Sequence, residues 1–397
     1  MSDLVSVASN AVQSYQRALG TVSNNIANVS TDGYSRQDVT LAANPVAKVG
    51  TVYLGTGVSV DGIKRQYDAF VETNMRNSNS DLASQEPMVN FANRVIDIMG
   101  STSMGLTSAL DQFFSGARDL SSDPASTVMR GSFLRDSENL AARFGELSSQ
   151  LDLVQNETDE TVKSYVNSMN TIFKQLATVN IQLTKQKSAA AQPPDLLDQR
   201  DVLLKELSGY AQIRTGFSEN GSVTVSLGPS LTRDVVVDGG KHFMLGTNFN
   251  SAAPEKVSLV LNPYGEATSL TGLTGGKLSG IMSFREQILG SSRSSLDTLA
   301  NNFVKEVNTI HSSGIDAYGN TGVDLFTIGK SSVGSAGTVK VAFNDALKVS
   351  AAAQFRIIES PNNTSSADAS IQFIGTSTNG PAPISSIISN NSNAAAA

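Results

Sequence analysis

Few side chains in this sequence have the type and spacing that catalysis or metal binding requires. The chain has no cysteine and two histidines, His242 and His311, which lie in different segments. Without cysteine there can be no disulfide, thiolate metal site or thiol nucleophile. Neither histidine has a second potential ligand near it in sequence, so a hydrogen-bonded or exposed imidazole is the better interpretation. We therefore expect no metal site and no cofactor.

An acidic cluster surrounds Arg200. Asp195, Asp198 and Asp201 recur every three residues and could place carboxylates on one helical face, as in an acid–base or cation site. Acidic residues near a helix start also complement the helix dipole, and Arg200 can pair with them. Acid–base catalysis needs a cleft and a perturbed pKa, which nothing in the sequence indicates. The structural interpretation is favoured.

Three loops have a partial likeness to ligand-binding motifs. The stretch Gly272–Leu278 has the wrong glycine-to-lysine spacing for a phosphate loop, and Leu278 stands where Ser or Thr would hold Mg²⁺. Gly55–Gly57 lacks the third glycine and the following helix of a dinucleotide fingerprint. Asp316–Asn320 begins like a calcium loop but has Tyr318 at the third position, so it predicts an ordinary turn. We expect the protein not to be an enzyme.

Composition excludes further classes of function. The formal net charge is −7 and only 16% of the 397 residues are charged, with no clustered Lys and Arg. This argues against nucleic acid and anionic membranes as partners. No run approaches the roughly 20 apolar residues of a membrane span. The N-terminus also has no basic region followed by an apolar one, so we expect no cleaved signal peptide. The length predicts two or three folding units.

The sharpest periodicity lies at the N-terminus, where two sets of apolar residues each recur every seven positions. They are Val5, Val12, Leu19 and Ile26, and Ala8, Tyr15, Val22 and Val29. This seam predicts a coiled-coil-type helix that packs against another helix. It could face the core of its own domain, but its narrowness and terminal position favour an assembly interface between molecules. Deletion of residues 2–30 should then abolish assembly and leave the central domain folded.

The rest of the chain predicts an α+β fold. Apolar residues spaced by seven between 133 and 154, and again between 162 and 183, predict long helices of an elongated bundle. After Gly209 the pattern alternates, which predicts short strands, with Asn220-Gly221 as a hairpin turn. We expect four segments: an axial helix and extended linker at 1–66, a helical bundle at 67–330 with a small β-region inserted at about 210–270, a β-rich outer domain at 331–390, and a disordered tail or truncation at 391–397.

The end of the first helix carries a motif. It comprises Asn24, Asn25, Ile26, Ala27 and Asn28, followed by Gly33, Tyr34, Ser35, Arg36 and Gln37. This stretch resembles the N-terminal signature of the flagellar rod, hook and hook-associated axial proteins, and its ending is similar to the hook-associated protein 1 family. Leu120–Ser126, Asp195–Asp201 and Gly275–Gly280 fit the same family. The resemblance covers residues 1 to about 330.

The resemblance implies a structural subunit of the hook–filament junction. It implies a ring-like homo-oligomer in the flagellar axis, with the hook protein and the second junction protein as neighbours. It also implies an extracellular location, reached through type III export without a cleaved signal peptide and with an export chaperone.

Two alternatives stay open within this picture. The chain could be another axial protein, such as a hook or filament subunit, or a flagellar-surface adhesin or enzyme with its activity in the β-region after 330. Family members close with a second helix that pairs with the N-terminal one, whereas this sequence ends in Ser, Asn and Ala. We therefore expect it to contain one half of the polymerisation interface.

Overall fold

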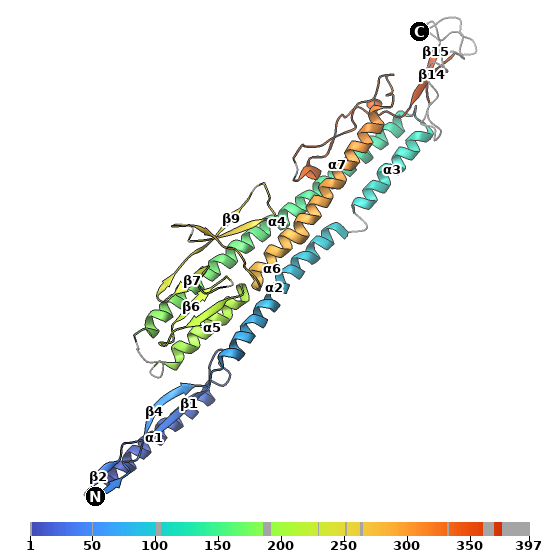
Figure 1. Cartoon of the computed structure of the whole chain (residues 1–397). Coiled ribbons are helices and arrows are strands. Elements are labelled where there is room, and N and C mark those ends of the chain that lie inside the picture. Colours follow the sequence, from blue (N-terminus) through green and yellow to red (C-terminus); the bar gives the residue numbers. More distant parts are fainter. Residues whose placement is uncertain are drawn as a thin grey trace. The chain divides into compact units, whose positions relative to one another are not determined.

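The computed structural model describes residues 2–49, 51–100, 105–185, 192–228, 230–250, 252–262, 265–331, 333–359 and 369–374. The chain forms two compact units (Figure 1). Unit 1 combines Met1–Asn90 with Thr158–Phe284, and unit 2 combines Phe91–Glu157 with the described residues from Arg285 onward. Helices and small antiparallel sheets make up both units, so the predicted α+β class is confirmed. No helix of the described segments has the length and apolar character to cross a membrane.

Unit 1 begins with a helix held against two-stranded sheets. The elements are α1 (Ser2–Ala27), β1 (Gln37–Ala43), β2 (Ala47–Val49), β3 (Val52–Leu54) and β4 (Val58–Arg65). Strands β1 and β4 pair antiparallel, and both contact α1. The expected extended linker is therefore a sheet that packs on the helix. Gly57, at φ +92°, lies so close to Val7 of α1 that a side chain there would be strained.

The remainder of unit 1 is helical with an inserted β-region. The helices are the first part of α2 (Ala69–Gly100), the last part of α4 (Thr127–Leu183), α5 (Pro194–Tyr210) and α6 (Gly276–Phe284). The β-region has a four-stranded sheet of β5 (Arg214–Phe217), β6 (Val223–Ser226), β7 (Val235–Asp238) and β8 (Lys241–His242), and a three-stranded sheet of β9 (Leu245–Phe249), β10 (Val257–Leu261) and β11 (Thr268–Ser269).

Two asparagines of α4 bind the two sheets. Asn180 is fully buried, and its side chain accepts from the N–H of Val223 and donates to the Val223 carbonyl, at 2.9 and 2.8 Å. Asn170 makes the same pair of bonds with Leu245 of β9. Each amide thus satisfies the backbone donor and acceptor of one strand residue. The strands β8 and β11 have two residues each, which is too short for the alternation used to predict strands.

Unit 2 contains the rest of α2 and α4 and a cluster of aromatic rings. Its other elements are α3 (Leu106–Ser122), the π-helical turn η2 (Arg285–Leu289), α7 (Gly290–Ser312), β12 (Phe326–Thr327), η3 (Ser335–Thr338), β13 (Lys340–Val341), η4 (Ala346–Lys348), β14 (Gln354–Glu359) and β15 (Ala369–Ile374). The ring of Phe113 on α3 lies 5.1 Å from that of Phe133 and 5.2 Å from that of Phe303, centre to centre. Such contacts add to the hydrophobic burial that joins the helices.

The two predicted sets of heptads belong to one helix. The 57-residue α4 runs through both, and the eight spacing residues from Phe133 to Leu183 are each at most 7% exposed. Only part of the apolar surface of α7 is buried. Leu296 is buried, but Leu299 is 43% and Ile310 68% exposed, because the bundle covers the row that contains Ala300 and Val304 instead. The expected tail at 391–397 and most of 360–390 lie outside the described residues.

Candidate assembly interface

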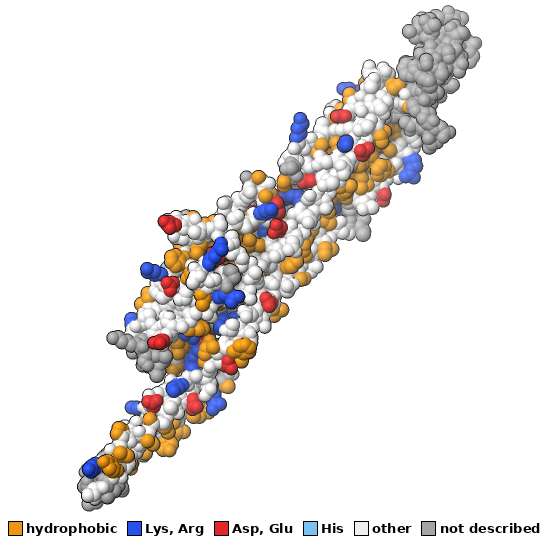
Figure 2. All heavy atoms as spheres, in the orientation of Figure 1, with side chains coloured by type: hydrophobic (Ala, Val, Ile, Leu, Met, Phe, Trp, Pro, Cys, Tyr) orange, Lys and Arg blue, Asp and Glu red, His pale blue; other side chains and the backbone are white. Residues whose placement is uncertain are grey.

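The predicted seam lies on the surface of α1. All eight of its residues are exposed, and the side chains of Val5, Leu19 and Ile26 are 69%, 66% and 69% accessible. Figure 2 shows apolar side chains lying open along this N-terminal segment. An isolated exposed apolar residue is ordinary, but a continuous stripe of them is typical of a contact surface. The helix α1 packs on the sheet of β1 and β4, but it does so through a face other than the seam.

Small and polar residues make the face of α1 that contacts the sheet. Ser14 and Thr21 are 4% and 7% exposed, and Ala11 and Ala18 on the same side of the helix are partly buried. The Ser14 hydroxyl lies 3.2 Å from the Val58 carbonyl of β4. Each residue turns the direction of a helical side chain by about 100°. The seam and the sheet-facing row therefore point in different directions, and contact with the sheet leaves the seam open.

Asn25 organises the turn after α1. Its side-chain amide donates to the Gln37 carbonyl at 2.8 Å, and its oxygen accepts from the Gln37 N–H at 2.9 Å. The Tyr34 hydroxyl donates to the same oxygen at 2.9 Å. Burial, together with the charges of Asp198 and Asp195, raises the pKa of Tyr34, so this hydroxyl stays protonated as a donor. The motif residues thus join the end of α1 to the first residue of β1.

The other motif residues shape the same turn. Asn28 donates to the Asn24 carbonyl at 3.0 Å and closes the last turn of the helix. Gly33 has φ +79°, and a Cβ there would clash with Cγ2 of Val202 on α5. The Ser35 N–H donates to Asp198 on α5 at 3.2 Å. Ala27 ends α1, and the Arg36 side chain is exposed.

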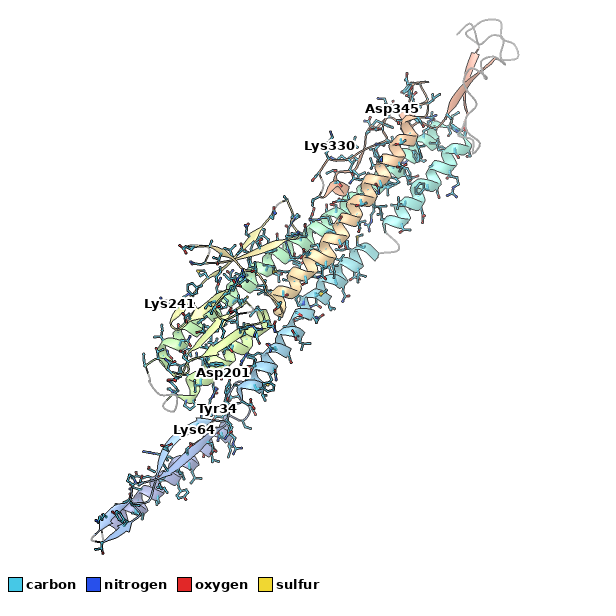
Figure 3. All side chains as sticks on the ribbon, viewed as in Figure 1. Tyr34, Lys64, Asp201, Lys241, Lys330 and Asp345 are labelled. Atoms are coloured by element: carbon cyan, nitrogen blue, oxygen red, sulfur yellow. The ribbon has the colours of Figure 1, made fainter. Side chains whose placement is uncertain are left out.

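A buried ion-pair network joins this N-terminal segment to α5. Arg65, the last residue of β4, donates from Nη1 to Asp198 at 2.7 Å and from Nη2 to Asp201 at 2.5 Å. The other oxygen of Asp201 accepts from Arg200 at 2.8 Å, which confirms that Arg200 pairs with the cluster. Figure 3 shows Tyr34, Lys64 and Asp201 at this junction. Asp195 stays exposed, so the three carboxylates do not form one site.

Two features of the structure were not predicted from the sequence. No local sequence pattern indicates the role of Arg65, because its partners lie more than 130 residues away in the chain. A second stripe on α2 did carry a signal, since Met75, Leu82, Val89 and Ile96 recur every seven residues and are all more than 50% exposed. The same spacing rule would have found it.

The other sequence candidates are hydrogen-bonded structural groups. His311 is 6% exposed, its Nδ1 faces the Val323 carbonyl, and its Nε2 accepts from the Ser350 N–H at 2.9 Å. His242 lies exposed on β8. Asp316 accepts from the N–H groups of Tyr318 and Asn320, which confirms an ordinary turn. Within the described residues, no three His, Cys, Asp or Glu side chains gather as metal ligands would.

Two family models and several relatives give a consistent comparison with known proteins. Residues 92–326 match the model of the flagellar hook-associated protein FlgK helical domain, and residues 6–34 match that of the flagella basal body rod protein. Flagellar hook-associated protein 1 of Salmonella typhimurium is 31% identical over 335 residues, which are 83% of this chain and 60% of that protein. The Bacillus subtilis protein of the same name is 26% identical over 84% of this chain and 73% of its own length.

A solved structure has a similar fold. The flagellar hook junction protein FlgK from Burkholderia pseudomallei superposes with a TM-score of 0.62 at 19% identity, over 74% of this chain and 68% of that one. The present chain spans 60% of the length of the Salmonella relative.

Proposed function

Because the chain belongs to the flagellar hook-associated protein FlgK family, we propose that it is a structural subunit of the hook–filament junction and assembles through the apolar seam of α1. The exposure of all eight seam residues carries this proposal. Residues of this size and spacing, left uncovered along a helix that is held in place, are suited to packing against another helix. A ring-like assembly in the flagellar axis follows, with the hook protein and the second junction protein as neighbours.

The match to a FlgK helical domain disfavours a hook or filament subunit. Under this proposal the protein acts outside the cell, after export through the flagellar type III route with the help of a chaperone. Its role is mechanical and not enzymatic. The fixed orientation of α1 supports this role. Arg65 and the turn at Asn25 hold the seam relative to α5, so that force on the seam is transmitted to the helical part of unit 1 through buried ion pairs.

Two neighbouring positions on α1 give a matched test. Val12 lies in the seam, and Gln13 is also exposed but points about 100° away, on the polar face. Val12→Asp introduces a charge into the proposed helix–helix contact, where an unpaired carboxylate would lose its hydration and oppose association. Expressed from the gene's own locus, Val12→Asp should abolish swarming and filament attachment, which are measured on soft agar and by electron microscopy.

Gln13→Asp is the control, since it adds the same charge to the same helix outside the seam. It should retain filaments and swarming. Circular dichroism of both purified variants should match that of the unmodified protein. Normal filaments on cells that carry Val12→Asp would rule out the seam as the assembly contact.

A further inference from the structure

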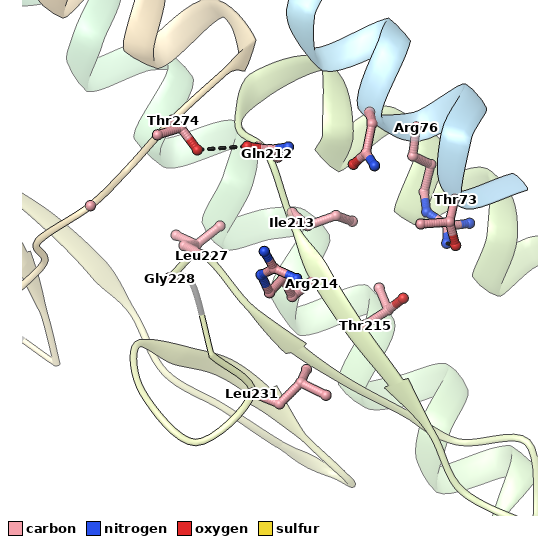
Figure 4. A pocket seen from close by; sticks show the side chains of 12 residues that line it. Thr73, Arg76, Gln212, Ile213, Arg214, Thr215, Leu227, Gly228, Leu231 and Thr274 are labelled. Atoms are coloured by element: carbon pink, nitrogen blue, oxygen red, sulfur yellow. Dashed lines mark hydrogen bonds between the residues drawn. The ribbon is translucent and has the colours of Figure 1, made fainter. Parts of the chain in front are cut away.

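Unit 1 contains a cavity of about 470 Å³ that the assembly role does not use. Figure 4 shows it between the first turns of α2, the start of β5, and the segments that follow β6 and precede α6. Its volume is in the range of pockets that hold small ligands. Polar side chains line one side, and Ile213, Leu227 and Leu231 form an apolar wall.

Arg76 of α2 is a buried arginine at the side of this cavity. Its side chain lines the cavity, although the residue is only 4% exposed. Nη2 donates to the Thr73 hydroxyl at 3.0 Å, whereas Nη1 is buried and meets no hydrogen-bond acceptor of the described protein. No described Asp or Glu forms an ion pair with it, in contrast to Arg65 and Arg200 of the same unit. A guanidinium withdrawn from water needs a negative partner to offset its desolvation.

The surroundings of Arg76 favour an anion. Arg214 of β5 contributes a second guanidinium at the exposed side, and no acidic residue is among the described residues that line the cavity. Oε1 of Gln212 accepts a hydrogen bond from the Thr274 hydroxyl at 2.6 Å, so the amide NH₂ of Gln212 is the group left to donate. The amide of Asn77 lines the same side. Two guanidinium groups with amide donors match the planar oxygens of a carboxylate or the oxygens of a phosphate.

We propose that this cavity is an oxyanion-binding site, in which the guanidinium groups of Arg76 and Arg214 hold a carboxylate or phosphate group. The oxyanion comes either from a free anion in solution or from an Asp or Glu side chain of a neighbouring molecule that inserts against the apolar wall. The site is separate from the α1 seam and does not depend on the function proposed above.

Binding can be measured directly on the purified chain. Inorganic phosphate and an acetylated, amidated glutamyl tripeptide are titrated separately at constant ionic strength, with calorimetry and thermal unfolding as readouts. Saturable binding of phosphate identifies a free anion as the ligand source, and binding of the peptide alone identifies a protein carboxylate. Arg76→Met keeps the apolar stem and should weaken binding about tenfold or more, because a charge-assisted hydrogen bond is lost.

Controls separate a ligand role from a purely structural one. The anion-free Arg76→Met protein should unfold at the same or a higher temperature, because an unpaired buried charge has been removed. Arg214→Met, at an exposed position, should fold normally and also weaken binding, whereas Arg233→Met, exposed and outside the cavity, should not. Unchanged affinity in both Arg76→Met and Arg214→Met, or no saturable binding of either anion, would overturn the proposal.

Discussion

Arg65 on β4 and Asp198 on α5 form a buried ion pair across 133 positions of sequence, with Nη1 and Oδ1 2.7 Å apart. Their side chains are 5% and 11% exposed. A second bond from the same guanidinium reaches Asp201. The strand that supports α1 is thereby anchored to the helical part of unit 1, so the orientation of the seam depends on a pair of charges far from it in sequence.

Replacing Arg65 by Met should destabilise unit 1 by about 3 to 5 kcal/mol, because the poorly solvated carboxylate of Asp198 loses its ion-pair partner and that of Asp201 keeps only Arg200. Urea unfolding measures the loss, and hydrogen exchange of β1 and β4 should show where it occurs. Arg94→Met removes a pair with Glu157 whose side chains are 46% and 47% exposed, and should change stability by less than about 1 kcal/mol. Equal effects of the two substitutions would contradict a special role for the buried network.

Gly33→Ala should also weaken the contact with α5. The backbone at φ +79° is strained for Ala, and the added methyl group meets Val202. Together these effects should cost about 2 kcal/mol or more in urea unfolding. The second substitution Val202→Ala removes the clash and should recover part of the loss.

A second glycine provides the control for Gly33. Gly20→Ala, in the exposed middle of α1 with open space around it, should stabilise the protein by roughly 0.5 to 1 kcal/mol. If Gly33→Ala were as harmless as Gly20→Ala, the close approach of this turn to α5 would not exist.

Removing single hydrogen bonds at the turn after α1 should produce graded effects. Tyr34→Phe deletes one bond to Asn25 and should cost about 1 kcal/mol. Asn25→Ala deletes three and leaves the N–H and carbonyl of the buried Gln37 without their partner, so its cost should be at least twice as large. Thermal unfolding ranks the two, and a larger effect for Tyr34→Phe would contradict the central place of Asn25.

The stability of unit 2 should fall between about pH 6.5 and pH 5. Burial lowers the pKa of His311, and Arg130 lowers it further, while the bond to the Val323 carbonyl and the charge of Asp324 oppose this. The folded state therefore binds a proton less readily than the unfolded chain, whose imidazole has a pKa of about 6.5. The stabilisation by neutral His311 is complete above that pH and decreases below it, by at most about 1.4 kcal/mol per pH unit.

The structural reason is the hydrogen bond from Ser350, which needs an unprotonated Nε2. Urea unfolding from pH 7.5 to pH 5 measures the effect. His311→Gln should flatten the profile, while His242→Gln, at an exposed position on β8, should leave it unchanged. A slope that persists in His311→Gln would assign the pH dependence to other groups.

Local patterns were enough to predict much of this molecule. The heptads of α1 and α4, the alternation of β5, β6, β7 and β10, and the Asn-Gly turn with Gly221 at φ +81° all express rules that act over a few residues. The same range covers the motif from Asn24 to Gln37, whose hydrogen bonds are almost all internal to it. For such features the sequence alone was sufficient.

Only the tertiary structure decided which faces and charges are covered. The α1 and α4 heptads look alike in sequence, yet one set is exposed and the other buried, because burial depends on which elements pack nearby. From the sequence, Asp198 and Asp201 could have faced water together with Arg200. The pairing of Arg65 with these two carboxylates depends on the contact between β4 and α5, which the sequence does not show. In the sequence Arg76 is an ordinary helical arginine, and only the fold buries it beside a cavity that Gln212 and Thr274 also line, with no ion pair to a described Asp or Glu. Contacts between distant segments are set by the whole fold, so no local pattern encodes them.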